Sequence, residues 1–382
     1  MALADMKIAV VGAGIGGVAV AVALARRGNS VTVFEQAPEL TEVGAGLQIS
    51  ANGMVVLRAL GIVGDVPPLA VRSNGTQICD FHRGRRVLKV APPNAGATWY
   101  FHRADLLDLL VRSAKQAGVS FTLDCSIEDV APGTGLVQTN GGLESSFDLV
   151  IAADGGHSRA RRILNPTGKA TFTRQVAWRS VIPWDRAGEA ATAMLSMGPR
   201  RHVVTYPLRE GSEMNIVAVE ERQDWTEEGW RQEGDPDDLR DRFSDFGGDV
   251  RTALAKVKKA HLWALYLHPV AERWHDGRMA LLGDAAHPTL PFMAQGACMA
   301  LEDAWAISAC LDRHQSVEEA LAQYQRLRHG RASHIVATAA GNARKFHLAP
   351  PMNWLAQGAL KTLGRLIVPR YDWIYDYDVT QI

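Results

Sequence analysis

The chain has 382 residues, 47% of them hydrophobic, and 41 basic residues balance 41 acidic ones, so its formal net charge is zero. This balance argues against a nucleic-acid surface, and the length is enough to bury the cores of two lobes. The four cysteines, Cys79, Cys125, Cys298 and Cys310, show no CxxC or Cys/His spacing, which predicts free thiols, no metal site and a cytoplasmic protein.

An uncharged, apolar stretch at residues 8–25 is about long enough to span a bilayer. It is rich in glycine, and Lys7 is the basic residue next to it, with the acidic Asp5 two positions earlier. A signal peptide needs a basic region before its apolar core. We therefore interpret the stretch as a strand, a turn and a helix, and we expect no contact with a membrane.

The apolar run at residues 7–11 predicts a β-strand, and the GxGxxG pattern of residues 12–17 follows it directly. In such a pattern Gly12 allows a tight turn and Gly14 lets a pyrophosphate approach the backbone. Gly17 then lets the following helix pack closely on the strand. The pattern predicts nucleotide binding, although the glycines alone would also suit an ordinary tight turn.

The rest of this unit has the order expected of a dinucleotide-binding fold. We expect a helix over residues 14–27, with its amino-terminal amides and dipole facing the phosphates, and Gly28 suits its left-handed end. A second strand at residues 30–34 leads into Glu35. A carboxylate at this point can accept hydrogen bonds from both ribose hydroxyls of an adenosine.

Residues 201–206 have the pattern of a strand that carries His202, Val204 and Tyr206 on one face. The Cα atoms of His202 and Tyr206 would then lie about 13 Å apart. A histidine can accept a proton near neutral pH, and a tyrosine hydroxyl can orient or relay one. The same pattern would also suit two half-buried sheet residues with satisfied hydrogen bonds.

A second glycine signature, Gly283-Asp284, follows the apolar run at residues 279–282. A carboxylate at the end of a strand suits hydrogen bonds to the ribityl chain of a flavin, although Asp284 would also serve as a helix cap. Residues 291–297 then open a long helix whose first amides would stabilise negative charge on a reduced flavin ring. Together the two signatures predict bound FAD.

Three motifs in this order resemble those of the single-component FAD-dependent aromatic hydroxylases, the flavoprotein monooxygenases of the p-hydroxybenzoate hydroxylase type. They are GxGxxG at residues 12–17, Asp-Gly-x-x-Ser-x-x-Arg at residues 154–161 and Gly-Asp at residues 283–284, and the likeness covers nearly the whole chain. Residues 177–179, 202–209 and 293–303 are similar to one branch of this family. That branch contains salicylate hydroxylase, 3-hydroxybenzoate 6-hydroxylase and 6-hydroxynicotinate 3-monooxygenase.

The resemblance implies an α/β fold, with a Rossmann-like FAD-binding domain of the GR2 type, an inserted mixed β-sheet substrate domain and a C-terminal helical tail. We expect the FAD-binding domain at residues 1–70, 100–170 and 270–340. The substrate domain would take residues 71–99 and 171–269, and an aromatic-rich tail of residues 341–382 would pack back on the body or on a second subunit. The family occurs as monomers or homodimers, and either state would suit this chain.

The resemblance also assigns site residues. The residues expected to contact the cofactor are Gly12, Gly14, Ile15, Gly17, Glu35, Gln36, Gly46, Arg103, Ile127, Asp154, Asp284, Pro291, Gly296, Ala297 and Cys298. Of these, Arg103 would use its side chain and Ile127 its backbone. His202 and Tyr206 are carried over as catalytic residues, because a matching histidine and tyrosine serve the substrate in several members of the branch. Cys298 needs no redox role, since a small packed residue suits its position.

The reaction that the resemblance implies is a hydroxylation with NADH or NADPH, dioxygen and FAD, through a C4a-hydroperoxyflavin. The substrate would be a small hydroxylated aromatic or heteroaromatic compound that carries a carboxylate. A flavin oxidoreductase or epoxidase that acts on an alicyclic or polycyclic compound is an alternative. A slow-turnover FAD-binding protein is another, because the glycine motifs report binding rather than turnover.

Three single positions narrow the range of expected substrates. The 6-hydroxynicotinate enzymes tend to have histidines at the places of Gln48 and Phe292, and the 3-hydroxybenzoate enzymes have a glutamine at the place of Pro291. These departures argue against both compounds and favour a related hydroxylated arene. Arg179 or Arg209 would suit a bidentate pair with a substrate carboxylate, although either would also suit a solvated sheet edge.

Overall fold

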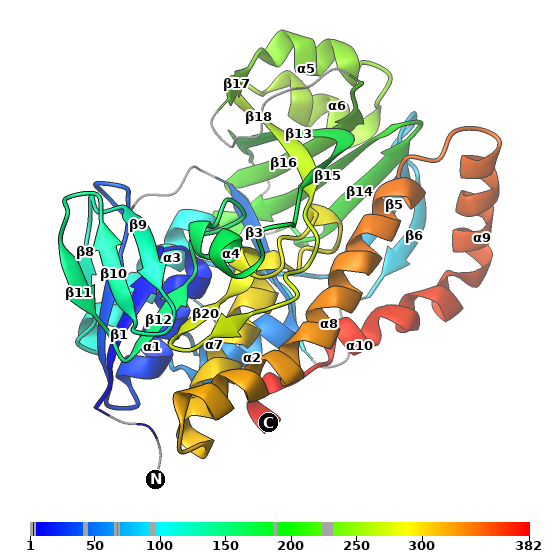
Figure 1. Ribbon diagram of the computed structural model, residues 1–382. Helices are drawn as coiled ribbons and strands as arrows, with labels where there is room; N and C mark the ends of the chain where they lie inside the picture. The colour runs from blue at the N-terminus through cyan, green and yellow to red at the C-terminus, as the bar shows by residue number, and fades with distance from the viewer. Residues whose placement is uncertain are drawn as a thin grey trace.

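A computed structural model describes residues 3, 5–40, 45–64, 67, 69–91, 96–185, 189–223 and 232–382 of the protein. Two large β-sheets occupy different parts of the molecule, and the long helices α7 (Gly296–Arg313) and α8 (Val317–Lys345) run along them (Figure 1). The acidic sequence of residues 224–241, which also contains Gly and Pro, predicts a surface helix with loops, and its first part, residues 224–231, lies outside the described residues. In the remainder of that stretch the chain forms β17 (Gln232–Gly234) and α5 (Pro236–Arg242).

The first sheet has six strands in the order β19-β20-β12-β1-β2-β8. The strands are β1 (Lys7–Val11), β2 (Ser30–Phe34), β8 (Ser120–Thr122), β12 (Leu149–Ala152), β19 (His275–Asp276) and β20 (Met279–Leu281). All pairs in this sheet are parallel except β19 with β20. Because parallel strands end at one edge, the residues after β1, β12 and β20 meet there, as the motif order predicts.

Helix α1 (Ile15–Ala25) follows β1 and packs between α3 (Arg103–Gln116) and α7. Residues 8–10 of β1 and 18–24 of α1 have no solvent exposure. The apolar stretch that resembled a membrane segment is therefore the core of this sheet. Among the described residues, no helix has the length and apolar character needed to cross a membrane.

The second sheet has eight strands in the order β17-β18-β13-β16-β15-β14-β5-β6. Besides β17, its strands are β5 (Thr76–Asp80), β6 (Arg86–Val90), β13 (Thr171–Pro183), β14 (Ala193–Gly198), β15 (Arg201–Leu208), β16 (Glu213–Glu221) and β18 (Ala260–Leu267). Helices α5 and α6 (Gly248–Ala255) bury one face of it, against residues such as Trp178 and Val203. The opposite face carries His202, Val204 and Tyr206 toward the rest of the molecule.

Smaller elements join the two sheets. Strands β3 (Gly46–Ile49), β4 (Val71–Arg72) and β7 (Trp99–His102) form one three-stranded sheet, and β9 (Ile127–Ala131), β10 (Leu136–Thr139) and β11 (Glu144–Ser146) form another. The remaining helices are α2 (Ala51–Ala59), α4 (Arg159–Leu164), α9 (Met352–Ile367) and α10 (Asp372–Tyr375). The fold class is thus the α/β arrangement that the motifs imply, whereas the domain boundaries stay a prediction.

The C-terminal tail returns to the body. Helix α9 stands beside β6 at the edge of the eight-stranded sheet (Figure 1). After it, the aromatic residues Tyr371, Trp373, Tyr375 and Tyr377 pack against the main core, as expected. Arg331 of α8 fastens this segment, because its guanidinium donates to the carbonyl oxygens of Trp373 and Ile374 at 2.9 and 2.7 Å.

A buried ionic cluster ties α7 to α8. The Arg328 guanidinium lies 2.5 Å from a carboxylate oxygen of Glu302 and 2.7 Å from one of Asp303, and all three side chains have 0% exposure. Burial alone would raise the pKa of Asp303, but the charges of His287 and Arg328 lower it to about 2. Asp303 is therefore ionised at neutral pH, and its charge is neutralised inside the protein.

Replacing Arg328 tests how much this cluster contributes to stability. In an Arg328→Met variant, the buried Asp303 loses its arginine partner and the buried Glu302 keeps Arg331, so we expect the free energy of unfolding to fall by about 3–5 kcal/mol. Urea denaturation of the flavin-bound protein measures it. The control is Arg326→Met on the exposed face of α8, which should change stability by less than about 0.5 kcal/mol. Equal losses in the two variants would contradict the proposed contribution.

Candidate active site

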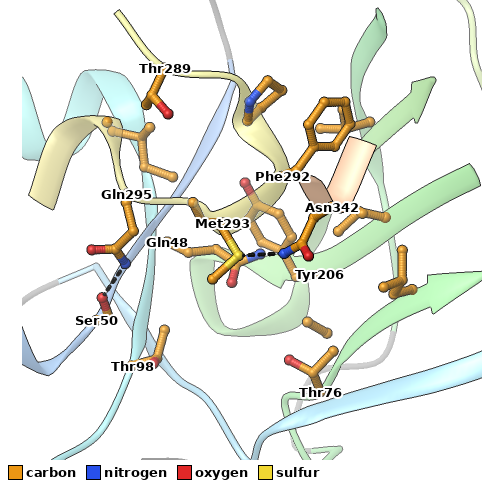
Figure 2. A pocket seen from close by; sticks show the side chains of 18 of the residues that line it. Gln48, Ser50, Thr76, Thr98, Tyr206, Thr289, Phe292, Met293, Gln295 and Asn342 are labelled. Carbon is orange, nitrogen blue, oxygen red and sulfur yellow. Dashed lines mark hydrogen bonds between the residues drawn. The ribbon is translucent and has the colours of Figure 1, made fainter. Parts of the chain in front are cut away.

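A cavity of about 950 Å³ lies between the carboxyl edge of the six-stranded sheet and the inner face of the eight-stranded sheet. Gly14 and Asp284, which the sequence places 270 residues apart, both line it. His202 and Tyr206 of β15 line the same cavity, and Figure 2 shows Tyr206 among side chains from several elements. The structure therefore brings the glycine signatures and the expected catalytic pair to one site.

The glycine turn leaves space for a ligand. A Cβ atom on Gly12, whose φ is +100°, would lie 2.5 Å from the Ala153 carbonyl oxygen, and one on Gly17 would lie 2.0 Å from the Gly12 carbonyl oxygen. The protein's own packing therefore requires both glycines. A Cβ atom on Gly14 would meet nothing within 4 Å. Since Gly14 and Ile15 line the cavity at the start of α1, this open space fits a pyrophosphate at a helix N-terminus.

Glu35 lies beside the glycine turn. Its carboxylate oxygens accept hydrogen bonds from the backbone N–H groups of Ala13 and Ala37, at 2.8 and 2.9 Å. These bonds orient the carboxylate and leave acceptor capacity for a ribose. Gln36 is exposed, and Ile127 uses its carbonyl oxygen to accept from Arg159 at 3.4 Å. Neither lines the cavity, so their contacts with the cofactor stay predictions, as does the ribose contact of Glu35.

The Asp-Gly-x-x-Ser-x-x-Arg motif connects two loops of the six-stranded sheet. Asp154 accepts from the Arg159 N–H at 2.8 Å, and Ser158 caps α4 by accepting from the Arg161 N–H at 2.9 Å. Arg161 then donates to the carbonyl oxygen of Ala286, beyond the Gly-Asp turn. The second oxygen of Asp154 is buried and has no hydrogen-bond partner among the described residues, and burial raises the pKa of this carboxyl.

Asp154 itself does not line the cavity, but its neighbours Ala153 and Gly155 do. An unsatisfied buried oxygen next to the cavity wall fits a site that a polar ligand completes. The open space at Gly14 agrees with a pyrophosphate, and this oxygen agrees with a ligand group, such as a hydroxyl, that donates a hydrogen bond.

Asp284 lies in a short turn after β20, at residues 283–285. Its side chain is accessible from the cavity although protein atoms surround it, and burial raises the pKa of its carboxyl against the opposing charges of His287 and Arg103. Arg103 reaches the same cavity from the start of α3. Residues 283–285 form a 3-10 helix with Leu282 at its N-cap position, so Asp284 caps no helix here and lines the cavity instead.

Helix α7 begins at Gly296 and directs its first turn into the cavity, where Pro291, Gly296 and Ala297 are lining residues. The buried Gln295 fixes this helix start by donating to the Ser50 hydroxyl at 2.9 Å (Figure 2). The first amides of α7 have no intrahelical acceptor, so they can face an anionic flavin ring.

Cys298 has a different environment from the residues before it. Its sulfur lies 3.5 Å from the Ser50 hydroxyl, toward α2, and it does not line the cavity. Burial raises the pKa of the Cys298 thiol to about 11, so the thiol stays protonated and unreactive. A contact of Cys298 with the cofactor stays a prediction. All four cysteines are free, and the described residues contain no group of three or more acidic, His or Cys side chains able to hold a metal ion.

His202 is 2% exposed and packs between two phenyl rings, with ring centroids 5.4 Å from Phe292 and 5.3 Å from Phe346. Its Nδ1 atom lies 2.7 Å from Nε2 of His347, a residue that follows α8. Burial, together with the charge that His347 would carry, lowers the pKa of His202 well below its ordinary value. The ring is therefore neutral at neutral pH and able to accept a proton.

Tyr206 packs against Tyr100, with ring centroids 5.0 Å apart and the ring planes tilted by 37°. Gly46 makes room for it, because a Cβ atom there would lie 2.6 Å from the Tyr206 ring. The Gly46 N–H also donates to Asn215 at 2.7 Å, which fixes β3 against the eight-stranded sheet. Burial raises the pKa of Tyr206, so its hydroxyl stays protonated and can donate a hydrogen bond. The Tyr206 ring therefore explains why position 46 is a glycine, and a contact of Gly46 with the cofactor stays a prediction.

The two candidate arginines differ in position. Arg179 of β13 lines the cavity beside the Trp263 ring, at 4.9 Å from its centroid. Arg209 does not line the cavity, and it forms ion pairs with Asp105 at 3.0 Å and Glu213 at 3.1 Å. Asp105 and Glu213 therefore already neutralise the Arg209 guanidinium, which leaves it less suited to pair with a substrate carboxylate.

Several residues of the site carry no signal in the sequence. No recognisable motif contains these residues. Three of them, Asn342, Lys345 and Phe346, line the cavity. His347 contacts His202, and Glu221 contacts His347. Residues 342–347 reach the site because α8 ends against the eight-stranded sheet, whereas Glu221 is the last residue of β16. Asn342 donates from there to the Met293 sulfur (Figure 2). Only the fold could reveal this contribution.

Comparison with known proteins agrees with this geometry. Residues 5–339 match the family model described as FAD binding domain. The chain is 35% identical over 356 residues to 3-amino-4-hydroxybenzoate 2-monooxygenase of Streptomyces cremeus, covering 90% of this chain and 88% of that protein. It is 32% identical to 3-hydroxybenzoate 6-hydroxylase of Polaromonas naphthalenivorans (strain CJ2), with 98% and 97% covered.

Comparison of the fold with solved structures points to the same kind of protein. A solved salicylate hydroxylase substrate complex superposes with a TM-score of 0.82 and 26% identity, covering 99% of this chain and 97% of that one. The match of sequence and fold extends over nearly the whole chain. The protein therefore belongs to the FAD-dependent aromatic hydroxylases, flavoprotein monooxygenases of the NAD(P)H-dependent class.

Proposed function

We propose that the protein hydroxylates a small aromatic compound that carries a hydroxyl group and a carboxylate, with NAD(P)H and dioxygen as co-substrates. One observation carries this proposal: His202 and Tyr206 line the same cavity as the residues suited to FAD. The substrates named for similar proteins support the substrate class. 3-Amino-4-hydroxybenzoate, 3-hydroxybenzoate and salicylate all combine a phenolic hydroxyl with a carboxylate.

We assign the cofactor to the wall of the cavity that the six-stranded sheet provides. Gly14 and Ile15 would hold its pyrophosphate, Glu35 its ribose, and Asp284 its ribityl chain. The first turn of α7, at Gly296 and Ala297, would stabilise negative charge on its ring. Bound there, FAD would supply the redox chemistry, in which it takes electrons from NAD(P)H and activates dioxygen.

His202 would act as the general base. A neutral imidazole that faces the cavity can remove the phenolic proton of the substrate, and this raises the electron density of the ring that is to be hydroxylated. Tyr206 keeps its proton, so it would donate a hydrogen bond that orients the substrate oxygen. Arg179 lies on β13, which β16 separates from β15 in the same sheet, and it would pair with the carboxylate.

The walls around His202 are suited to excluding water. Phe292, Phe346 and Val204 line the cavity next to it, and Leu348 and Leu360 extend this apolar lining from the C-terminal tail. Water that entered would let a reactive oxygen intermediate decay to hydrogen peroxide. The apolar side chains next to His202 therefore support coupled hydroxylation. A monomeric or homodimeric state and a cytoplasmic location stay expectations.

A panel of arenes tests the reaction. We expect one or more hydroxybenzoates, aminohydroxybenzoates or hydroxypyridine carboxylates to stimulate NADH or NADPH oxidation and to gain one oxygen atom. Oxygen uptake and product mass measure this. Stimulation by an alicyclic or polycyclic compound would favour the alternative oxidoreductase or epoxidase. Flavin reduction that responds to none of the compounds would contradict the proposed function.

Asp284→Ala tests the assignment of the cofactor. Loss of a charged hydrogen-bond partner costs about 1.5–3 kcal/mol, so FAD binding should weaken by about 10- to 100-fold. Absorbance of the purified protein and fluorescence titration of the apoprotein measure FAD content and affinity. Asp276→Ala, an exposed aspartate on β19 outside the cavity, is the matched control. A fully loaded Asp284→Ala protein would remove this residue from the cofactor site.

His202→Ala tests the base. Loss of general base catalysis should lower the rate of coupled hydroxylation by about 10²- to 10⁴-fold, while FAD content stays unchanged. Product mass and hydrogen peroxide release separate coupled from uncoupled turnover. His275→Ala on β19, away from the cavity, should behave like the unmodified enzyme. Unchanged product formation in His202→Ala would exclude His202 from the mechanism.

A further inference from the structure

Behind His202, on the side away from the cavity, two more side chains continue a chain of hydrogen bonds. His202 Nδ1 lies 2.7 Å from His347 Nε2, and His347 Nδ1 lies 3.2 Å from a carboxylate oxygen of Glu221 at the end of β16. His347 is 5% exposed, whereas the side chain of Glu221 is 31% exposed. The three residues therefore connect the buried ring of His202 to the protein surface.

Both imidazoles are neutral at neutral pH. Burial lowers the pKa of His347 to about 4, against the opposing effect of Glu221, and His202 is shifted in the same direction. A neutral imidazole carries one N–H, so one of the two rings must donate in the bond between them. This leaves two possible arrangements of protons along the chain.

In the first arrangement, His347 donates from Nδ1 to Glu221 and accepts at Nε2 from His202 Nδ1. His202 then has no proton on Nε2, the nitrogen that is left for the cavity, and it can act as a base. In the second arrangement, every proton is reversed. His202 would then present an N–H to the cavity, and it could not remove a proton from a substrate.

Glu221 discriminates between the two arrangements. An ionised carboxylate only accepts hydrogen bonds, so the second arrangement would place a nitrogen lone pair against a carboxylate lone pair. Gln175 Nε2 also lies 3.2 Å from His347 Nδ1 and would suit that arrangement, but its amide also donates to the Ala343 carbonyl oxygen at 3.3 Å. A hydrogen bond to an ionised group is about twice as strong as a neutral one, so Glu221 prevails.

The ionised state of Glu221 is supported by its other oxygen, which accepts from Arg200 at 2.9 Å. The backbone of Arg200 also donates to the His347 carbonyl oxygen at 3.1 Å. The turn between β14 and β15 thus holds both members of the chain in place. Arg200 and Glu221 are the charged groups at the outer end, and Arg179 and Lys345 line the cavity at the inner end.

We propose that Glu221, acting through His347, fixes the tautomer of His202 so that an unprotonated nitrogen faces the substrate, and that these three side chains carry the substrate's proton to solvent. This proposal rests on the proposed function of His202 as the base. Glu221 and His347 touch neither substrate nor cofactor, so both are positioning residues.

The transfer balances as follows. The phenolic O–H bond of the substrate breaks, its electron pair stays on oxygen, and the proton forms a new N–H bond at His202 Nε2. The proton on His202 Nδ1 passes to His347 Nε2, and the proton on His347 Nδ1 passes to Glu221, which releases it to water. The rings are then in the second arrangement. When the product's phenolate oxygen takes the proton from His202 Nε2, the same transfers run in reverse, a proton from water enters at Glu221, and the first arrangement returns. No electron is transferred. Because an imidazolium between two phenyl rings is unfavourable, an exit for the proton is what lets His202 work as a base.

The nitrogen chemical shifts of histidine report the tautomer directly. In flavin-bound enzyme labelled with ¹⁵N-histidine, we expect His202 and His347 each to have a protonated Nδ1 and an unprotonated Nε2, with signals assigned from His202→Gln and His347→Gln spectra. Glu221→Gln introduces an amide that can donate to His347, so both rings should shift toward the reversed pattern. This readout needs no substrate, so it stands whether or not the proposed reaction is correct.

Kinetics provide the second arm. Glu221→Gln should lower the rate of coupled hydroxylation about a hundredfold at unchanged FAD content, within the range that base catalysis contributes. Glu213→Gln, the same change at the other end of β16 and away from both histidines, is the matched control. It should keep both the nitrogen pattern and the rate.

The outcomes separate the two proposals. An unchanged nitrogen pattern in Glu221→Gln, whatever its rate, overturns the control of the tautomer by Glu221. A reversed pattern with an unchanged rate overturns the link to proton removal. If His202→Ala retains coupled hydroxylation while the nitrogen pattern still responds to Glu221, the proposed base is wrong and the tautomer control stands.

Discussion

The site depends on one buried carboxylate, that of Asp303 in α7. One of its oxygens accepts from the Gly283 N–H at 3.1 Å and lies 2.5 Å from a ring nitrogen of His287, while the other accepts from Arg328 at 2.7 Å. The turn that carries Asp284 is therefore fastened to the helix whose first turn faces the same cavity. Since this charge lies in the interior, its partners must stay in place, and the geometry of the cofactor wall follows from them.

The cofactor half of the protein could be predicted from the sequence, because its chemistry is carried by local patterns. Gly12, Gly17 and the apolar runs of β1, β12 and β20 have backbone and packing requirements that few other residues meet. The edge of a parallel sheet then brings their ends together without further information. For the same reason His202 and Tyr206 could be placed on one face of a strand, and both line the cavity.

The substrate half could be predicted only in part, because its residues meet through long-range packing. His347, Lys345 and Phe346 owe their positions to the length of α8 and to where it ends against the eight-stranded sheet. No local pattern distinguished Arg179, which lines the cavity, from Arg209, which pairs with Asp105. Gly46 was expected at the cofactor, and its immediate steric reason in the structure is the ring of Tyr206.

The family model ends at residue 339, yet the cavity continues beyond it. Asn342, Phe346, Leu348 and Leu360 line the cavity from this C-terminal segment, next to the proposed base His202. Exchange of this C-terminal segment between paralogues would therefore change which arene is accepted and leave the flavin machinery intact. Divergence of substrate range in such enzymes has a modular route, in which a peripheral helix is rebuilt around a preserved redox centre.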